Sequence, residues 1–328
     1  MNRYVYAPFA LGFMYVGAEH QAVSSYQIKN CELENYLADK HNLPDRAKIY
    51  FSLSSRLSGS AFTTLLALCK IHDENRQRGF QDCSSISMAP AAHLKSLLNR
   101  SNSGKSSKYI ESAILELTQI NVKFTAQIDG TEIDLSSAPI LTEFCNGKLT
   151  ISEATAFSTL DSVKSNRNRN WSFGFSDAFE ILLKRDLSNK PVFTTAKYNL
   201  DELTQYRSDS IALQIMAHIS VSARENRAAF PRSILKLMER LGFEIKDLIN
   251  DKRKLKKAGD RVKKAIKKIP TLITRAKDKT YKHFIYQTLI HDYNLAISTL
   301  INRVKQLRNP LQKLRYIPPS AAYIYIPS

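Results

Sequence analysis

HLKSLLNRSNSGKSSKYIESAILELTQINVKFTAQIDG, residues 93–130, is the stretch that decides the fold. Its apolar residues first recur at helical spacing, in two groups. These groups are Leu94, Leu97 and Leu98, then Ile110, Ala113, Ile114, Leu117 and Ile120. From Val122 apolar and polar residues alternate up to Asp129-Gly130, a strong hairpin signal. The stretch predicts a short helix, a longer helix and a β-hairpin, in that order.

A further helix is predicted upstream of this stretch. Ser58-Gly59-Ser60 precedes apolar residues at the spacing of a helix buried on one face, namely Phe62, Leu65, Leu66 and Cys69. Pro90 stands where the short helix would begin. Three helices followed by a hairpin is the order of a winged helix-turn-helix. We predict such a first domain over residues 46–196, behind an N-terminal extension at 1–45 that lacks clear periodicity.

The second half of the chain repeats this order less regularly. Helices are predicted around 211–219, 231–242 and 250–269, and residues 271–290 have the pattern of two strands joined by a basic loop. We predict a second winged-helix domain over 197–290, then a C-terminal helix and a Pro-rich tail over 291–328. The expected fold class is α+β, mainly helical, with two tandem winged helix-turn-helix domains.

Charge is concentrated at the C-terminal end. Residues 221–328 hold 25 of the 48 Lys and Arg but only 8 of the 30 Asp and Glu, a net +17 within a total of +18. Such asymmetry favours a polyanionic partner, because basic side chains release the counterions condensed on nucleic acid. Anionic membrane is the competing polyanion, but the basic segment lacks the Trp/Phe face of a surface-binding helix, and no apolar run is long enough to span a bilayer.

Cysteine spacing bears on the compartment. The four cysteines include no CxxC pair, so neither a zinc site nor a disulfide scaffold is indicated, and a reducing cytoplasm is the expected location.

The candidate DNA-binding residues lie at the start of each domain's third helix and in the second wing, where side chains would meet base edges and phosphates. In the first domain they are Arg100, Lys105, Ser106, Ser107, Lys108 and Tyr109. In the third predicted helix of the second domain they are Lys252, Arg253, Lys254, Lys256, Lys257, Arg261, Lys263, Lys264, Lys267 and Lys268. The second wing adds Arg275, Lys277, Lys279 and Lys282. The alternative interpretation of each group is a solvated helix face.

Catalytic motifs are absent from the sequence. NRSNSGKSS ends like a phosphate-binding loop, but Asn99 replaces the first glycine of GxxxxGK. None of the seven histidines forms an HxH pair, and no tyrosine comes with a recognisable base. We therefore expect no catalytic residue, no metal and no cofactor.

Four stretches stand out together with the order of the elements: SAFTTLLALCKIHDENR (60–76), residues 93–130, SFGFSDAFEILLKRD (172–186) and residues 198–243. In these stretches and in element order the chain resembles the iteron-binding plasmid replication initiators, Rep proteins with two winged-helix domains. The resemblance implies binding of double-stranded DNA at repeated origin sites, origin melting, and recruitment of the host replication initiator and helicase. It also implies that the first domain can support a homodimer or add DNA contacts.

Two other functions stay open from sequence. A winged-helix transcriptional repressor would use the same fold on a single palindrome. A nucleic-acid-processing enzyme is the second alternative, and it lacks a coherent cluster of carboxylates or histidines. The lysine-rich third helix of the second domain holds few of the Arg, Asn and Gln side chains that recognise bases bidentately.

Overall fold

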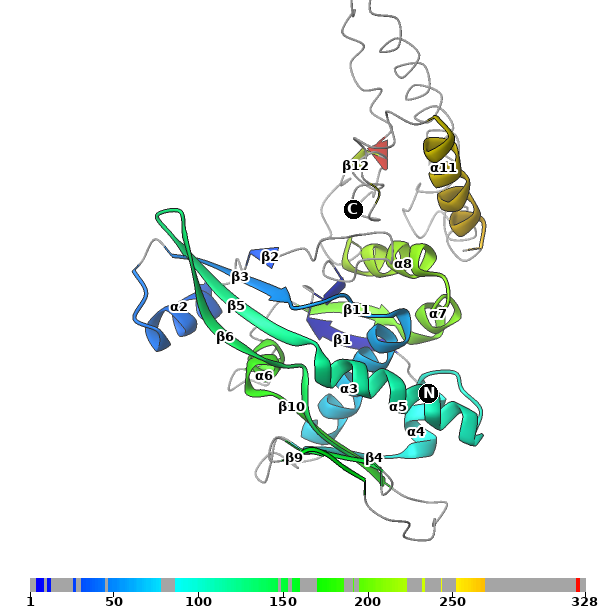
Figure 1. Cartoon of the computed structure of the whole chain (residues 1–328), viewed down its shortest axis with the longest axis horizontal. Helices are drawn as coiled ribbons and strands as arrows, with labels where there is room; N and C mark the ends of the chain where they lie inside the picture. The colour runs from blue at the N-terminus through cyan, green and yellow to red at the C-terminus, as the bar shows by residue number, and fades with distance from the viewer. Residues whose placement is uncertain are drawn as a thin grey trace, which may run out of the picture. The chain divides into compact units, whose positions relative to one another are not determined.

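A computed structural model gives the fold of the chain (Figure 1). The residues that it describes are 4–8, 11–12, 26–27, 31–44, 47–77, 86–146, 149–152, 155–159, 170–185, 191, 195–222, 232–233, 243, 252–268 and 323–324. Contacts divide the chain into two units: residues 1–15 with 23–208, and residues 16–22 with 209–328. The predicted domain limits remain a prediction.

Helices α3 (Gly59–Gln77) and α5 (Gly104–Gln119) form the helical part of the first core. Helix α3 packs against α5 and the short α4 (Ala91–Leu97). The apolar positions expected to face inward are buried, including Phe62 on α3 and Ile114 on α5. Ser58 and Ser103 cap α3 and α5: each hydroxyl accepts a backbone N–H, Ala61 at 3.0 Å and Ser106 at 3.3 Å. The three predicted helices of the first domain are confirmed.

The predicted hairpin belongs to a four-stranded antiparallel sheet, in the order β2-β3-β5-β6. Its strands are β2 (Tyr26–Gln27), β3 (Lys48–Leu53), β5 (Asn121–Ile128) and β6 (Thr131–Pro139). Asp129 and Gly130 both have positive φ, +48° and +85°, as a two-residue hairpin turn of the I′ type requires. In Figure 1 the β5–β6 hairpin projects away from α3 and α5, and α2 lies beside it.

A second antiparallel sheet has five strands, in the order β4-β10-β7-β8-β9. They are β4 (Ile86–Pro90), β7 (Leu141–Cys145), β8 (Leu149–Ser152), β9 (Thr155–Thr159) and β10 (Asn170–Phe175). Phe144 of β7 and Trp171 of β10 meet edge to face, with ring centroids 5.6 Å apart. This pair packs two neighbouring strands of the same sheet against each other.

The chain's N-terminal end joins the first unit through a two-stranded ribbon. Strand β1 (Tyr4–Pro8) pairs antiparallel with β11 (Thr195–Asn199), and Val5, Ala7 and Tyr198 are buried beneath it. Helices α2 (Cys31–Lys40), α6 (Asp177–Leu183) and α7 (Leu200–Gln205) complete the unit. Ordered elements therefore lie within the stretch 1–45, where the sequence has no clear period.

The second unit contains α8 (Ser210–Ser222), α11 (Lys252–Lys267), β12 (Arg232–Ser233) and β13 (Tyr323–Ile324). Helices α8 and α11 pack against each other, and β12 pairs with β13. Two predicted helices, around 211–219 and 250–269, are confirmed by α8 and α11. Of the helix predicted around 231–242 only Arg232–Ser233 is described, and these two residues form strand β12. The predicted strands at 271–290 and the predicted helix after residue 291 lie outside the described residues.

The prediction of a mainly helical fold is wrong. The first unit alone holds four-stranded and five-stranded antiparallel sheets besides the β1–β11 ribbon. Short strands such as LTIS (149–152) have too few residues to show an alternating pattern, and β4 and β10 become adjacent only through the fold. Sequence periodicity detected the confirmed helices and the β5–β6 hairpin, and it missed most strands of the five-stranded sheet.

Candidate nucleic-acid interface

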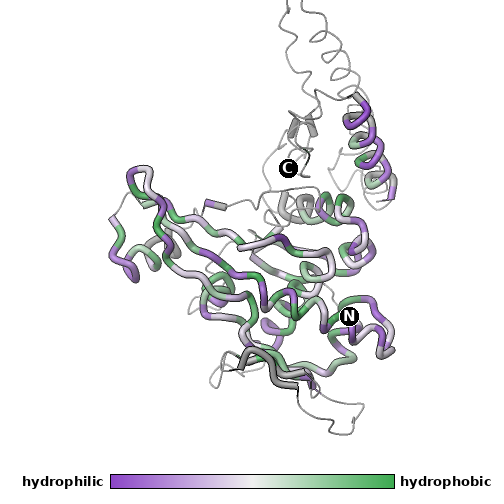
Figure 2. Tube along the Cα trace, viewed as in Figure 1, coloured by the Kyte–Doolittle hydropathy of each residue, from purple (hydrophilic) through white to green (hydrophobic). Residues whose placement is uncertain are grey.

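Helix α11 separates a buried apolar side from an exposed basic side. Ala258, Val262 and Ala265 are at most 4% exposed and recur at the i, i+4, i+7 spacing of one helix face. In Figure 2 the helix is mostly hydrophilic, with hydrophobic residues at intervals. The exposed cations Arg253, Lys257, Arg261 and Lys264 follow the same kind of spacing on another face, and we call these four residues the basic stripe.

The basic stripe borders a shallow groove of about 360 Å³ that also includes Asp260. Asp260 lies three residues after Lys257 and four before Lys264, so its carboxylate offsets part of the repulsion between the lysines. The groove is open to solvent and its described walls come from α11. It therefore offers a charged surface and not an enclosed ligand pocket.

Lys268, just after α11, ties this helix to the start of α8. Its Nζ lies 2.6 Å from Oδ2 of Asp209, whose other carboxylate oxygen accepts the Ala212 N–H at 3.2 Å. Burial opposes ionisation of Asp209, but the hydrogen bonds from Lys268 and from the backbone outweigh it and lower its pKa. Lys268 thus links the end of α11 to the start of α8, and its predicted contact with DNA stays a prediction.

The remaining predicted residues of this unit are placed as follows. Lys254 is exposed on α11, and Lys252, Lys256, Lys263 and Lys267 lie in the same helix, although their side chains are outside the described part. Arg275, Lys277, Lys279 and Lys282, the predicted wing cations, also lie outside the described residues.

The start of α5 carries a second basic group, in the first unit. Lys105, Lys108 and Tyr109 are exposed at i, i+3, i+4 spacing, and the first turn contains no acidic residue. Ser107 is half-buried, and Ser106 is buried. The guanidinium of Arg100 lies 4.7 Å from the centre of the Tyr109 ring. The structure brings these predicted residues together around the N-terminal turn of α5.

Arg207 joins the group around α5 and was missed by sequence reasoning. Its Nη1 donates a hydrogen bond to the Leu98 carbonyl at 3.0 Å. Burial and then the positive charge of Arg207 lower the pKa of Arg100. Arg207 follows α7, about a hundred residues later in the chain, so no local pattern could have linked it to Arg100.

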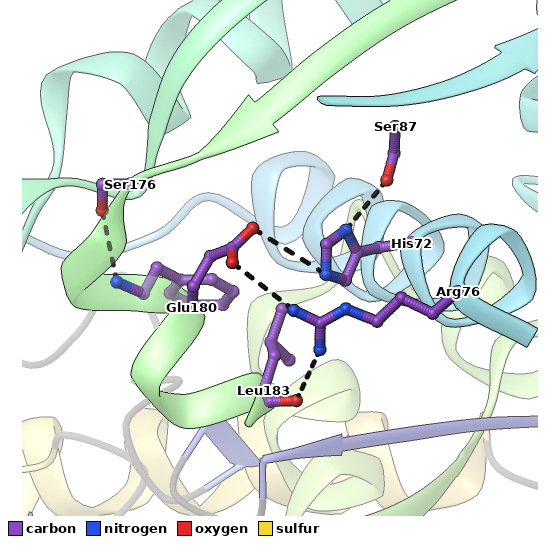
Figure 3. Close-up of polar contacts among 7 residues, drawn as sticks. His72, Arg76, Ser87, Ser176, Glu180 and Leu183 are labelled. Atoms are coloured by element: carbon purple, nitrogen blue, oxygen red, sulfur yellow. Dashed lines mark hydrogen bonds and ion pairs between the residues drawn. The ribbon is translucent and has the colours of Figure 1, made fainter. Parts of the chain in front are cut away.

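A buried polar cluster between α3, α6 and β4 imitates a Ser-His-Glu triad (Figure 3). Nδ1 of His72 lies 2.8 Å from the Ser87 hydroxyl, and Nε2 lies 3.9 Å from Oε1 of Glu180. Arg76 binds the other Glu180 oxygen at 3.4 Å and the Leu183 carbonyl at 2.9 Å. The cluster links α3 to α6 in the core.

Two properties argue against a catalytic role for this cluster. Burial, followed by the charges of Arg76 and Arg185, lowers the pKa of His72 to about 4, which makes it a weak base near neutral pH. The adjoining cavity has room for about one water, about 20 Å³, and Ser87 is not among its described lining residues. We assign the cluster a structural role.

The described part of the chain has neither a candidate metal cluster nor a membrane-spanning helix. There, no group of three or more His, Cys, Asp or Glu residues is arranged to hold a metal ion. Among the described helices, none has both the length and the apolar character needed to cross a bilayer.

Among known proteins, the chain is similar in part to two solved structures. No family model and no curated protein matches the chain. Crystal structures of RctB domains 2 and 3 are similar in part. One, of selenomethionine derivatives, has 9% identity and a TM-score of 0.42 and covers 72% of this chain and 78% of its own. Another has 14% identity and a TM-score of 0.39, with 75% and 83% covered. Function is therefore inferred from this chain's own residues.

Proposed function

We propose that this protein is a replication initiator that binds repeated double-stranded DNA sites at an origin. The observation that carries the DNA-binding part is the basic stripe, which α11 presents on a side separate from its buried apolar face. Evenly spaced cations on one helix suit the phosphates along a groove of DNA. The initiator part is supported by the resemblance of element order in the sequence, and we assign the protein no catalytic step.

The two units each contribute a basic helix to the proposal. The second unit supplies α11, and the first supplies the start of α5, where Arg100, Lys105, Lys108 and Arg207 gather around backbone N–H groups that favour phosphate. The larger charge of α11 makes it the main contact. The α5 group then adds contacts or fixes the register on each repeat. We also propose that the origin lies on a plasmid and that the protein forms a homodimer. At the origin it recruits the host replication initiator and helicase.

The test is duplex binding as a function of salt. We compare Lys257→Ala/Lys264→Ala with the matched control Lys40→Ala/Lys48→Ala, which removes two exposed lysines of the first unit. Losing two phosphate contacts should lower the slope of log K against log salt by about 1.8, using about 0.9 per contact. The control should keep the wild-type slope. Lys268 is left intact, because its substitution would also release α11 from Asp209.

Sequence preference separates the alternatives. The probe is duplex DNA from the regions that flank the protein's own gene, and scrambled duplex is the comparison. Stepwise binding to several repeats supports the initiator. Binding to one palindrome, without opening of adjacent duplex, would favour the repressor. Equal slopes for the stripe variant and its control would overturn the assignment of α11 as the DNA-binding helix.

A further inference from the structure

The outward side of the β1–β11 ribbon carries two exposed aromatic rings. Tyr4 and Tyr6 are 37% and 54% exposed, while the alternate residues Val5 and Ala7 are buried. Side chains two residues apart on a strand lie on one side, about 7 Å apart. Lys197 of β11 stands opposite Tyr6 in the register, and its Nζ lies 4.0 Å from the centre of the Tyr4 ring. Two rings and a cation therefore share this side.

A further ring–cation pair lies between α2 and the residues just after α6. Tyr6 and Arg185 line one small cavity, and Arg185 is bonded to Lys184 in the chain. The Nζ of Lys184 lies 4.3 Å from the ring centre of Tyr36, which is 39% exposed. We name the set Tyr4, Lys197, Tyr6, Arg185, Lys184 and Tyr36 the tyrosine track.

The charges along the tyrosine track favour an anion. Lys184 and Lys197 are exposed. The nearest acid among the described lining residues of the cavity is Asp73, whose carboxylate is paired with Arg185. Tyr4 and Tyr36 each have a lysine over the ring, and Tyr6 lines a cavity with Arg185. Rings beside cations can bind a chain of bases and phosphates, because rings stack with bases of any identity and cations follow the backbone.

We propose that the tyrosine track binds single-stranded DNA. The proposal rests on the function proposed above, because an initiator that opens an origin exposes a single strand beside the duplex that it holds. Tyr4 and Tyr6 each stack with a base, Lys197 and Lys184 contact phosphates, and Tyr36 extends the contact. The track is separate in sequence and in residues from the basic stripe of α11 and from the α5 group.

The experiment uses the full chain, a fluorescent oligo-dT of about 12 nucleotides, and the same strand with abasic sites throughout. The variant is Tyr4→Leu/Tyr6→Leu, and Tyr4→Phe/Tyr6→Phe is the control that retains stacking. Wild type should bind oligo-dT at least tenfold more tightly than the abasic strand, because phosphates alone cannot stack. The Leu variant should lose this difference, and the Phe variant should retain it.

Duplex binding in the same samples separates this proposal from the previous one. The Leu variant should bind origin duplex as wild type does, which also shows that it is folded. Equal affinity of wild type for oligo-dT and the abasic strand, with duplex binding intact, would overturn the tyrosine track alone. Tighter binding of oligo-rU than of oligo-dT would reassign the track to RNA. Failure of the wild-type protein to bind origin duplex would overturn the proposed function.

Discussion

Acidification should destabilise the first unit through His72. The imidazole is 7% exposed, is packed edge-on against Phe175 at 5.3 Å, and has a pKa near 4 because of burial and the nearby charges of Arg76 and Arg185. In the unfolded chain a histidine has a pKa near 6.5. The unfolded state therefore binds one more proton between these values, and stability falls as pH decreases from 6.5 toward 4.

The magnitude follows from the two pKa values. Each pKa unit corresponds to about 1.4 kcal/mol, so the full penalty is about 3 kcal/mol, of which about 2 kcal/mol is reached at pH 5. Glu180 acts in the opposite direction: burial and the nearby Asp177 raise its pKa although Arg76 lowers it, so its uptake of a proton favours the folded state as pH falls. The Glu180→Gln background removes this second titration.

The assay is urea unfolding at pH 7 and pH 5 for Glu180→Gln and for His72→Gln/Glu180→Gln. Glutamine at position 72 stays neutral and keeps a polar partner near Ser87. The double variant's stability relative to Glu180→Gln should improve by about 2 kcal/mol on going from pH 7 to pH 5. A relative stability that is the same at both pH values would refute a buried, neutral His72.

Three smaller predictions concern caps, turns and thiols. Asp209→Ala should destabilise the second unit by about 1–2 kcal/mol, seen as a lower urea midpoint, and Lys268→Ala by less than about 1 kcal/mol, because the helix cap contributes more than a half-exposed ion pair. Gly130→Ala should cost about 1 kcal/mol in thermal unfolding, since its φ is +85° while space around it is open. Cys69 is buried with a raised pKa, so native-state alkylation should modify Cys145 before Cys69, and mass spectrometry would show this order.

The helices of the first core could be predicted because their information is local. Ile110, Ile114 and Leu117 recur at helical spacing and are all buried, and Ser103 supplies the cap where the pattern begins. The Asp129-Gly130 turn was equally readable, because few residue pairs adopt two consecutive positive φ values. The five-stranded sheet was not readable, since its strands are short and β4 pairs with β10 across more than eighty residues.

The residues of the candidate interface also differ in whether local sequence could reveal them. Lysines clustered within one helix were visible in the sequence, and their exposure at Lys257 and Lys264 needed only a helical period. Arg207 beside Arg100, and Lys197 above Tyr4, depend on contacts between distant segments. Lys268 shows the converse case: it matched the charge pattern, but the fold gives it Asp209 as a partner.

Like charge on α11 also explains why a polyanion is the expected partner. Arg253–Lys257 and Lys257–Arg261 are like-charged i, i+4 pairs, each destabilising by about 0.2–0.5 kcal/mol, and Asp260 offsets only part of this. The packing of α11 does not depend on these charges, because Ala258, Val262 and Ala265 form its buried side. A helix that needed only to pack on α8 would be more stable with acidic residues among the lysines. DNA phosphates remove the repulsion on binding, so the helix should become more stable in the complex than alone, and protection of its backbone amides from hydrogen exchange should increase when duplex is added.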